Sequence, residues 1–206
     1  MSQITEGLEA GNAGSGPWRQ PGQRLVSVDD EAPVAPLVVT LQMGEEAAAR
    51  FTDLRRTHFP AHRNWLDAHV TLFHALPGTA IDAVLADVAD AATRQAPFSM
   101  RLERVLFLGA GVAYALASPE ADRLRSTLAH RWAALLGRQD RARRSALHIT
   151  VQNKVAPGLT RALYEQLGAG FEPEDVPAVG VQVWHYAGGP WRPAASYPFR
   201  GSVAGA

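Results

Sequence analysis

The chain has 206 residues, and its 20 Lys and Arg balance its 20 Asp and Glu, so it lacks the positive field that attracts long duplex nucleic acid or an anionic membrane. It has no cysteine, which excludes disulfide scaffolds, thiol nucleophiles and cysteine-ligated zinc. No apolar run is long enough to span a membrane, and the first residues lack the basic and apolar segments of a signal peptide. These observations lead us to expect a cytoplasmic protein with no membrane partner.

Composition and periodicity divide the chain into three parts. Residues 1–34 are rich in Gly, Ser, Pro and Gln without a regular apolar period, and we expect a disordered leader there. Residues 35–201 carry the folded domain, and 202–206 form a flexible tail. In chain order, the patterns predict a strand at 37–43, a helix at 45–58, a strand at 67–76, a helix from 81, strands at 98–107 and 112–117, a helix from 119, a strand at 147–155, a helix at 158–167, and strands near 179–186 and 195–200.

The order of these elements repeats. Each half has a strand, a helix, a strand that carries His-x-Thr, a helix and another strand, and His69 and His148 occupy matching places. We therefore expect an α+β fold with two pseudo-symmetric β-α-β-α-β lobes, whose largely antiparallel sheets face a central cleft.

The two His-x-Thr strands carry the chemistry. Side chains alternate along a strand, so His69 and Thr71 share one face and Val70 and Leu72 the other, apolar face. His148 and Thr150 repeat the pattern. Two histidines can divide the roles of general base and general acid near neutral pH, and a threonine hydroxyl can donate to a phosphate oxygen where charge develops. This scheme requires neither a metal nor another cofactor.

The pair "HVTL" and "HITV", with "HVTLFHALPG", "LHITVQNKV" and "GGPW", resembles the 2H phosphoesterase superfamily, in particular its 2′-5′ RNA ligase and cyclic phosphodiesterase-like branch. The resemblance covers roughly residues 35 to 201. It implies that His69 and His148 are the acid and base, that Thr71 and Thr150 hold the phosphate, and that the substrate is a 2′,3′-cyclic phosphate or a 2′-5′ linkage of a nucleotide or an RNA end.

Four further residues are candidates for substrate binding. Phe73 continues the open face and could stack on a base or fill the cleft floor, while Gln152 and Lys154 extend the polar face beyond Thr150. Trp191 in "GGPW" could border the cleft or cover the core. The arginines of residues 137–145 could guide an RNA end or belong to a solvated loop, and His74 is expected to point into the core.

Two other functions fit the same residues. One is a histidine-based metallohydrolase that uses His69, His148 and carboxylates such as Asp67, although threonine, not a carboxylate, is the repeated companion here. The other is a module that binds a nucleotide or an RNA end without turnover. The sequence does not identify a protein partner.

Overall fold

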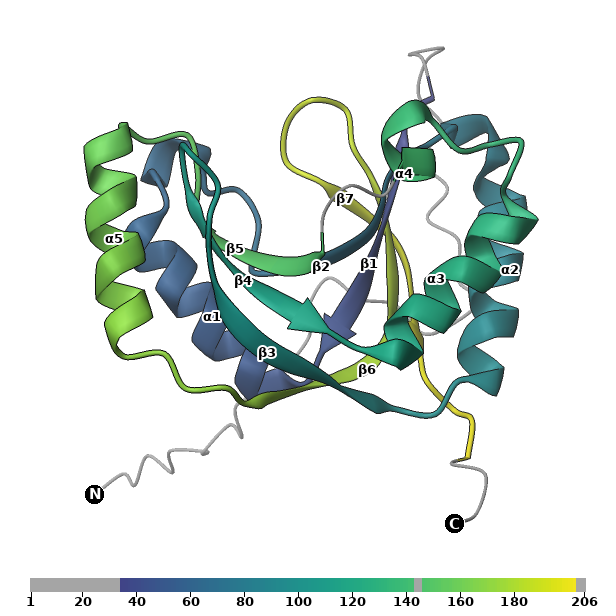
Figure 1. Ribbon diagram of the computed structural model, residues 1–206. Helices are drawn as coiled ribbons and strands as arrows, with labels where there is room; N and C mark the ends of the chain where they lie inside the picture. The colour runs from purple at the N-terminus through teal and green to yellow at the C-terminus, as the bar shows by residue number, and fades with distance from the viewer. Residues whose placement is uncertain (1–33, 143–145, 203–206) are drawn as a thin grey trace, which may run out of the picture.

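A computed structural model describes residues 34–142 and 146–202 (Figure 1). The predicted leader, except for residue 34, and most of the predicted tail lie outside these residues. The elements are β1 (Leu37–Met43), α1 (Glu45–His58), β2 (Val70–Leu76), α2 (Ile81–Arg94), β3 (Phe98–Phe107), β4 (Val112–Ala117), α3 (Pro119–Arg131), α4 (Arg138–Ala142), β5 (Leu147–Gln152), α5 (Pro157–Ala169), β6 (Asp175–His185) and β7 (Arg192–Pro198), with short 3-10 turns at Ala61–Arg63 and Gly78–Ala80.

The strands form one antiparallel sheet in the order β1-β2-β5-β4-β3-β6-β7, and β1 also pairs with β6. The first six strands therefore close into a ring, and β7 extends it alongside β6. Closure leaves few open strand edges, which are otherwise sites of aggregation.

The two halves of the chain are interleaved in this ring. Exchanging β1 with β4, β2 with β5 and β3 with β6 leaves every pairing in the ring unchanged. The third strand of each half pairs with strands of the other half. β3 lies between β4 and β6, and β6 lies between β3 and β1. The expectation of two separate facing sheets is wrong in this respect, because strand edges that would stay open in each half are paired with the other half.

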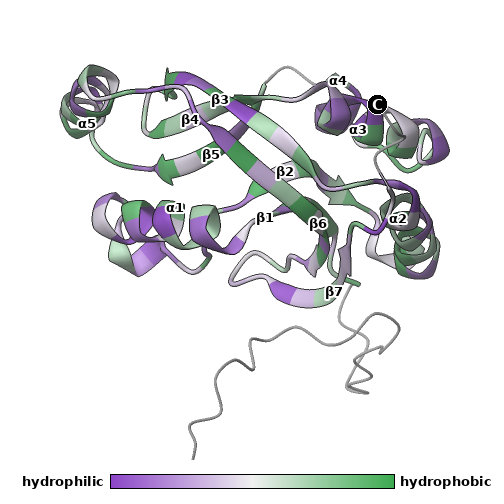
Figure 2. Ribbon diagram, turned by 90° about the horizontal axis from the view of Figure 1, so that it is seen from below, coloured by the Kyte–Doolittle hydropathy of each residue, from purple (hydrophilic) through white to green (hydrophobic). Residues whose placement is uncertain are grey.

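The helices gather in two groups on opposite sides of the strands. Figures 1 and 2 both show α1 with α5 on one side and α2 with α3 on the other, so each group takes one helix from each half. Hydrophilic and hydrophobic residues alternate along these helices in Figure 2, as expected for helices with one buried face. Their apolar faces join the sheet in one core that includes Phe51, Val84, Leu128 and Leu163.

Local signals explain where elements begin. The predicted start of α3 is confirmed: the Ser118 hydroxyl accepts a hydrogen bond from the Ala121 backbone N–H at 3.3 Å, and Pro119 occupies the first helical position. Within the described residues, no helix is long and apolar enough to cross a membrane.

Candidate active site

The centre of the site is the contact between β2 and β5. These strands are antiparallel, and Val70 is paired with Ile149. Both side chains are fully buried. The flanking residues therefore project from the opposite face, and the register sets His69 across from Thr150 and Thr71 across from His148. The two imidazoles thus occupy one diagonal of a four-residue group and the two hydroxyls the other.

The two imidazoles are held in the same way. His69 Nδ1 lies 2.8 Å from the carbonyl oxygen of Asp67, and His148 Nδ1 lies 2.9 Å from that of Ala146, in each case two residues earlier. A carbonyl only accepts, so each Nδ1 carries its hydrogen and donates it. Each Nε2 is consequently the nitrogen left for proton transfer.

The electrostatic environment of His69 keeps its ring neutral. Burial, followed by the charges of Arg55, His148 and His74, lowers the pKa of His69 to about 4, against the opposing effect of the hydrogen bond to Asp67. At pH 7 His69 Nε2 is therefore an acceptor.

Trp191 supplies much of the cover over His69. Its ring lies 4.8 Å from the imidazole, centroid to centroid, and 5.9 Å from the ring of Trp184. Trp184 is fixed in turn by its indole N–H, which donates to the buried Thr40 hydroxyl at 2.9 Å. The turn before Trp191 requires a left-handed residue, supplied by Gly188 with φ 84°. Of the two readings left open for Trp191, the structure favours a place at the border of the site.

A buried arginine of α1 forms hydrogen bonds with both the segment before the first motif and the second motif. Arg55 donates to the side-chain oxygen of Asn64 at 2.8 Å and to the backbone oxygens of Leu66 and Thr150 at 2.9 Å each. Burial lowers the pKa of Arg55 to about 10, which still leaves it charged at neutral pH. Thr52, one turn earlier, accepts from the backbone N–H of Ala68 at 3.1 Å. Together these contacts fix the segment that leads into His69.

α3 provides a second buried arginine on the other side. Arg125 donates to the backbone oxygen of Leu72 in β2 at 3.2 Å and to that of Asp140 in α4 at 2.6 Å, and its guanidinium lies 4.9 Å from the ring centre of Phe73. Thus the first helix of each half holds the motif strand of the other half.

Irregular pairing in β2 reverses two of the predicted orientations. The register with β1 shifts on both sides of the Val39–Phe73 pair, so strict alternation ends after Thr71. Phe73 is fully buried, with its ring edge-on to Trp132 at 4.9 Å, and it is unavailable to stack on a base. His74, expected in the core, instead faces the same hollow as Thr71 and His148.

The two polar residues beyond Thr150 do not reach the site. Gln152 is buried after a second register shift, opposite Val112 in β4, and Lys154 is exposed in a left-handed conformation (φ 59°) past the end of β5. Neither residue lines either of the hollows at the site. The geometry gives no support to the prediction that they bind substrate, because β5 ends at Gln152 and its open face does not continue to Lys154.

Two hollows lie at the histidine pair, one lined by His148 and the other by His69. The first, here the His148 cavity, has a volume of about 420 Å³ and is lined by Thr71, Leu72, His74, Arg125, Arg138, Gln139, Asp140, Ala142, Ala146, Leu147 and His148. The second, the tryptophan groove, measures about 1170 Å³ and includes His69, Trp65, Trp184 and Trp191. Thr150 lines neither hollow. The site is therefore aromatic beside His69, whereas most of the residues beside His148 have charged or polar side chains.

The donor set does not favour a metal centre. In the part of the chain that the structure describes, no three His, Asp or Glu side chains gather as a metal site would require. The Asp67 carboxylate is exposed and lies 3.7 Å from Arg56, and only the backbone oxygen of Asp67 contacts His69.

Comparison with known proteins identifies the family. A family model described as the 2′-5′ RNA ligase superfamily matches residues 43–190, and the chain belongs to this superfamily. The fold resembles TT0787 of Thermus thermophilus (TM-score 0.58, 18% identity, covering 82% of this chain and 100% of that one). It also resembles E. coli LigT complexed with 3′-AMP (TM-score 0.55, 16% identity, 80% and 98% covered) and with phosphate (TM-score 0.51, 16% identity, 82% and 99% covered). Comparison with curated proteins found no match.

Sequence reasoning missed the residues that position the site. These residues act through partners distant in the chain, and they are Arg55, Arg125 and Asp140. No local sequence pattern indicates the role of the two arginines. One signal was available for Asp140, an isolated acid within the basic segment 137–145. Arg143 and Arg144 of that segment lie outside the described residues, whereas Arg138 begins α4 and lines the His148 cavity.

Proposed function

We propose that the protein is a phosphoesterase that cleaves 2′-5′ phosphodiester linkages or 2′,3′-cyclic phosphates of nucleotides or RNA ends without a metal. The observation that carries the proposal is the pairing of Val70 with Ile149, which sets the two imidazoles diagonally around one space with both Nε2 atoms available. A phosphate in that space can be reached by a base on one side and an acid on the other.

The two histidines take different roles in this proposal. Neutral His69 accepts a proton from the attacking nucleophile, a water molecule or a ribose hydroxyl, as its lowered pKa favours. His148 Nε2 donates a proton to the leaving oxygen, and the Nδ1 hydrogen bond to Ala146 keeps its ring oriented. The Thr71 and Thr150 hydroxyls donate to the non-bridging phosphate oxygens, where negative charge grows in the transition state.

The aromatic side of the site supports a nucleotide substrate. Trp191 presents an indole next to the proposed base, and indoles stack on nucleobases of any sequence. That E. coli LigT, which has a similar fold, has been crystallised with 3′-AMP and with phosphate is consistent with a nucleotide substrate.

The test is a cleavage assay in excess chelator with 2′-5′-linked and 3′-5′-linked diadenosine and with 2′,3′-cyclic AMP. We expect cleavage of the 2′-5′-linked diadenosine, of 2′,3′-cyclic AMP, or of both. His69→Ala and His148→Ala should each lower kcat/KM roughly 10²-fold or more. The double variant should lose far less than the product of the single losses, because the pair acts as a unit. His130→Ala removes an exposed histidine of α3 and serves as the control.

Two outcomes would overturn the proposal in different ways. Activity that disappears with chelator and returns with a divalent ion would favour the metallohydrolase. Tight binding of 3′-AMP without cleavage of any of these substrates would favour a non-catalytic binding module.

A further inference from the structure

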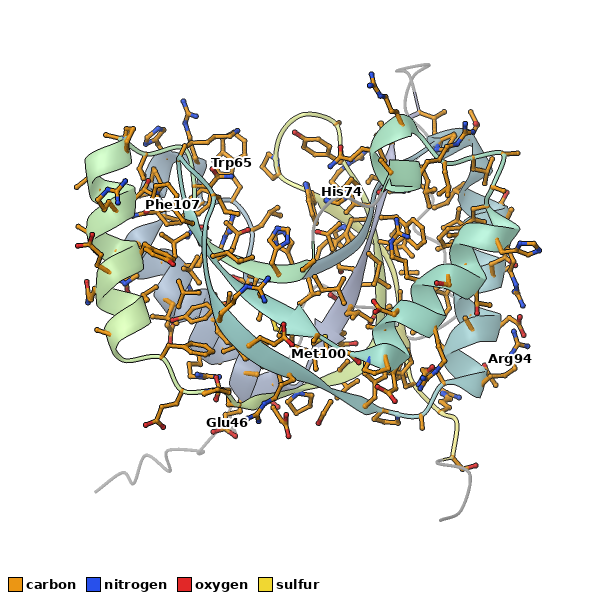
Figure 3. The ribbon with its side chains drawn as sticks, in the orientation of Figure 1. Glu46, Trp65, His74, Arg94, Met100 and Phe107 are labelled. Atoms are coloured by element: carbon orange, nitrogen blue, oxygen red, sulfur yellow. The ribbon has the colours of Figure 1, made fainter. Side chains whose placement is uncertain are left out.

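The His148 cavity holds a third histidine that the proposed reaction does not use. His74 lies within the irregular stretch of β2 and beside α4 (Figure 3). Its side chain is 38% exposed and lines the same hollow as Thr71 and His148. A histidine exposed to a cavity next to a reaction centre is available to a ligand there.

A buried carboxylate fixes the ring of His74. Asp140, whose side chain is 2% exposed, lies 3.0 Å from His74 Nδ1 and also accepts the backbone N–H groups of His74 and Ala75 at 3.0 to 3.1 Å. Burial opposes ionisation of Asp140, yet these hydrogen bonds hold its pKa below the ordinary value. The carboxylate therefore accepts a hydrogen bond from Nδ1–H, and Nε2 is the ring nitrogen that can contact a ligand.

The remaining charges of the cavity favour an anion. Arg138 is exposed at the start of α4, and the buried Arg125 lies on the other side of Asp140, whose backbone oxygen it binds. Two arginines thus outweigh the one carboxylate of the lining, and that carboxylate is already occupied by three donors. A guanidinium group, and a histidine ring that carries hydrogen on both nitrogens, are typical donors to phosphate oxygens.

We propose that the His148 cavity is a second phosphate subsite, in which His74 Nε2 and Arg138 bind the phosphate on the far side of the leaving nucleoside. The inference rests on the proposed function, because a leaving oxygen protonated by His148 places the leaving nucleoside at the mouth of this cavity. The preferred substrate is then an oligonucleotide whose leaving nucleoside carries a further phosphate, not a mononucleotide cyclic phosphate.

The test compares two ligands by isothermal titration calorimetry. Adenosine 3′,5′-bisphosphate carries one phosphate for the catalytic position and one for the subsite, whereas adenosine 5′-monophosphate carries only the first. We expect the bisphosphate to bind the unmodified protein about tenfold more tightly or better, as one charge-assisted contact allows. His74→Ala and Arg138→Ala should each bring that ratio towards one.

A matched variant separates the subsite from a general loss of charge. Arg141→Ala removes the same charge from the same helix, but Arg141 points to the Ala133 backbone oxygen and does not line the cavity, so the ratio should persist. Misfolding lowers the active fraction for both ligands and leaves their relative affinity unchanged.

The outcomes distinguish the two proposals. A ratio near one in the unmodified protein, or a ratio equally reduced in all three variants, overturns the subsite even if phosphodiesters are cleaved. A ratio that depends on His74 and Arg138, in a protein that cleaves no phosphodiester, supports the subsite and overturns the proposed function.

Discussion

Removal of the ring that covers His69 should shift the acid limb of the pH profile. Trp191→Ala exposes the imidazole to water, so its pKa should rise from about 4 towards the ordinary value near 6.5. At pH 5 roughly nine-tenths of the rings are neutral with the lower pKa and only about 3% with the higher one. Since the proposed base works only when neutral, kcat/KM at pH 5 should fall by up to about 30-fold beyond any loss seen at pH 7, where most rings are neutral in both proteins.

The assay is kcat/KM from pH 4 to pH 8, together with an NMR titration of the His69 ring in both proteins. Trp191→Phe keeps an aromatic ring over the imidazole and should retain the low pKa. If Trp191→Ala lowers kcat/KM by the same factor at every pH and leaves the His69 titration in place, Trp191 acts on substrate alone and the reasoning about its cover is wrong.

Three other predictions concern the framework of the site. Thr71→Val and Thr150→Val keep the side-chain shape but remove a hydrogen-bond donor. We expect kcat to fall roughly 10-fold to 10³-fold while the melting temperature stays unchanged. A variant that loses activity because its melting temperature falls would contradict the phosphate-binding role. Phe73→Ala should cost about 3–5 kcal/mol in the free energy of unfolding, measured in urea, because the ring is fully buried; a loss of substrate affinity at full stability would restore the stacking role. Arg55→Met should cost about 3 kcal/mol or more by leaving buried acceptors unpaired, whereas Arg56→Met, at an exposed ion pair, should cost less than about 1 kcal/mol; equal losses would show that Arg55 is no anchor.

Local patterns were enough to predict most of the elements. The strand of residues 37–43, the helix of 45–58 and the strands of 98–107 and 112–117 are confirmed at both ends. The capping signal of Ser118 and Pro119 succeeded because it depends on a few consecutive residues. His148 lies on β5 as the local periodicity predicted, whereas His69 immediately precedes β2, which begins at Val70 and not at residue 67.

The predicted side-chain orientations beyond the two motifs were wrong where the regular alternation of the strand ended. Register shifts in β2 turned Phe73 into the core and His74 towards the cavity, and no residue type in the sequence announces them. β5 likewise ends at Gln152, and Lys154 beyond it has a left-handed backbone. Register depends on what the neighbouring strands require, which a single sequence does not display.

The exchange of third strands makes the histidine pair depend on β6, a strand that follows both motifs in the chain. β2 and β5 touch at a single registered pair, and the ring that holds them together closes only when β6 inserts between β1 and β3. A nascent or truncated chain that stops before β6 contains both histidines but leaves strand edges of both halves unsealed, and such edges recruit other chains. We therefore expect copies that are truncated before β6 to be lost to aggregation or proteolysis, so that the histidine pair is held in place only once β6 has joined the ring.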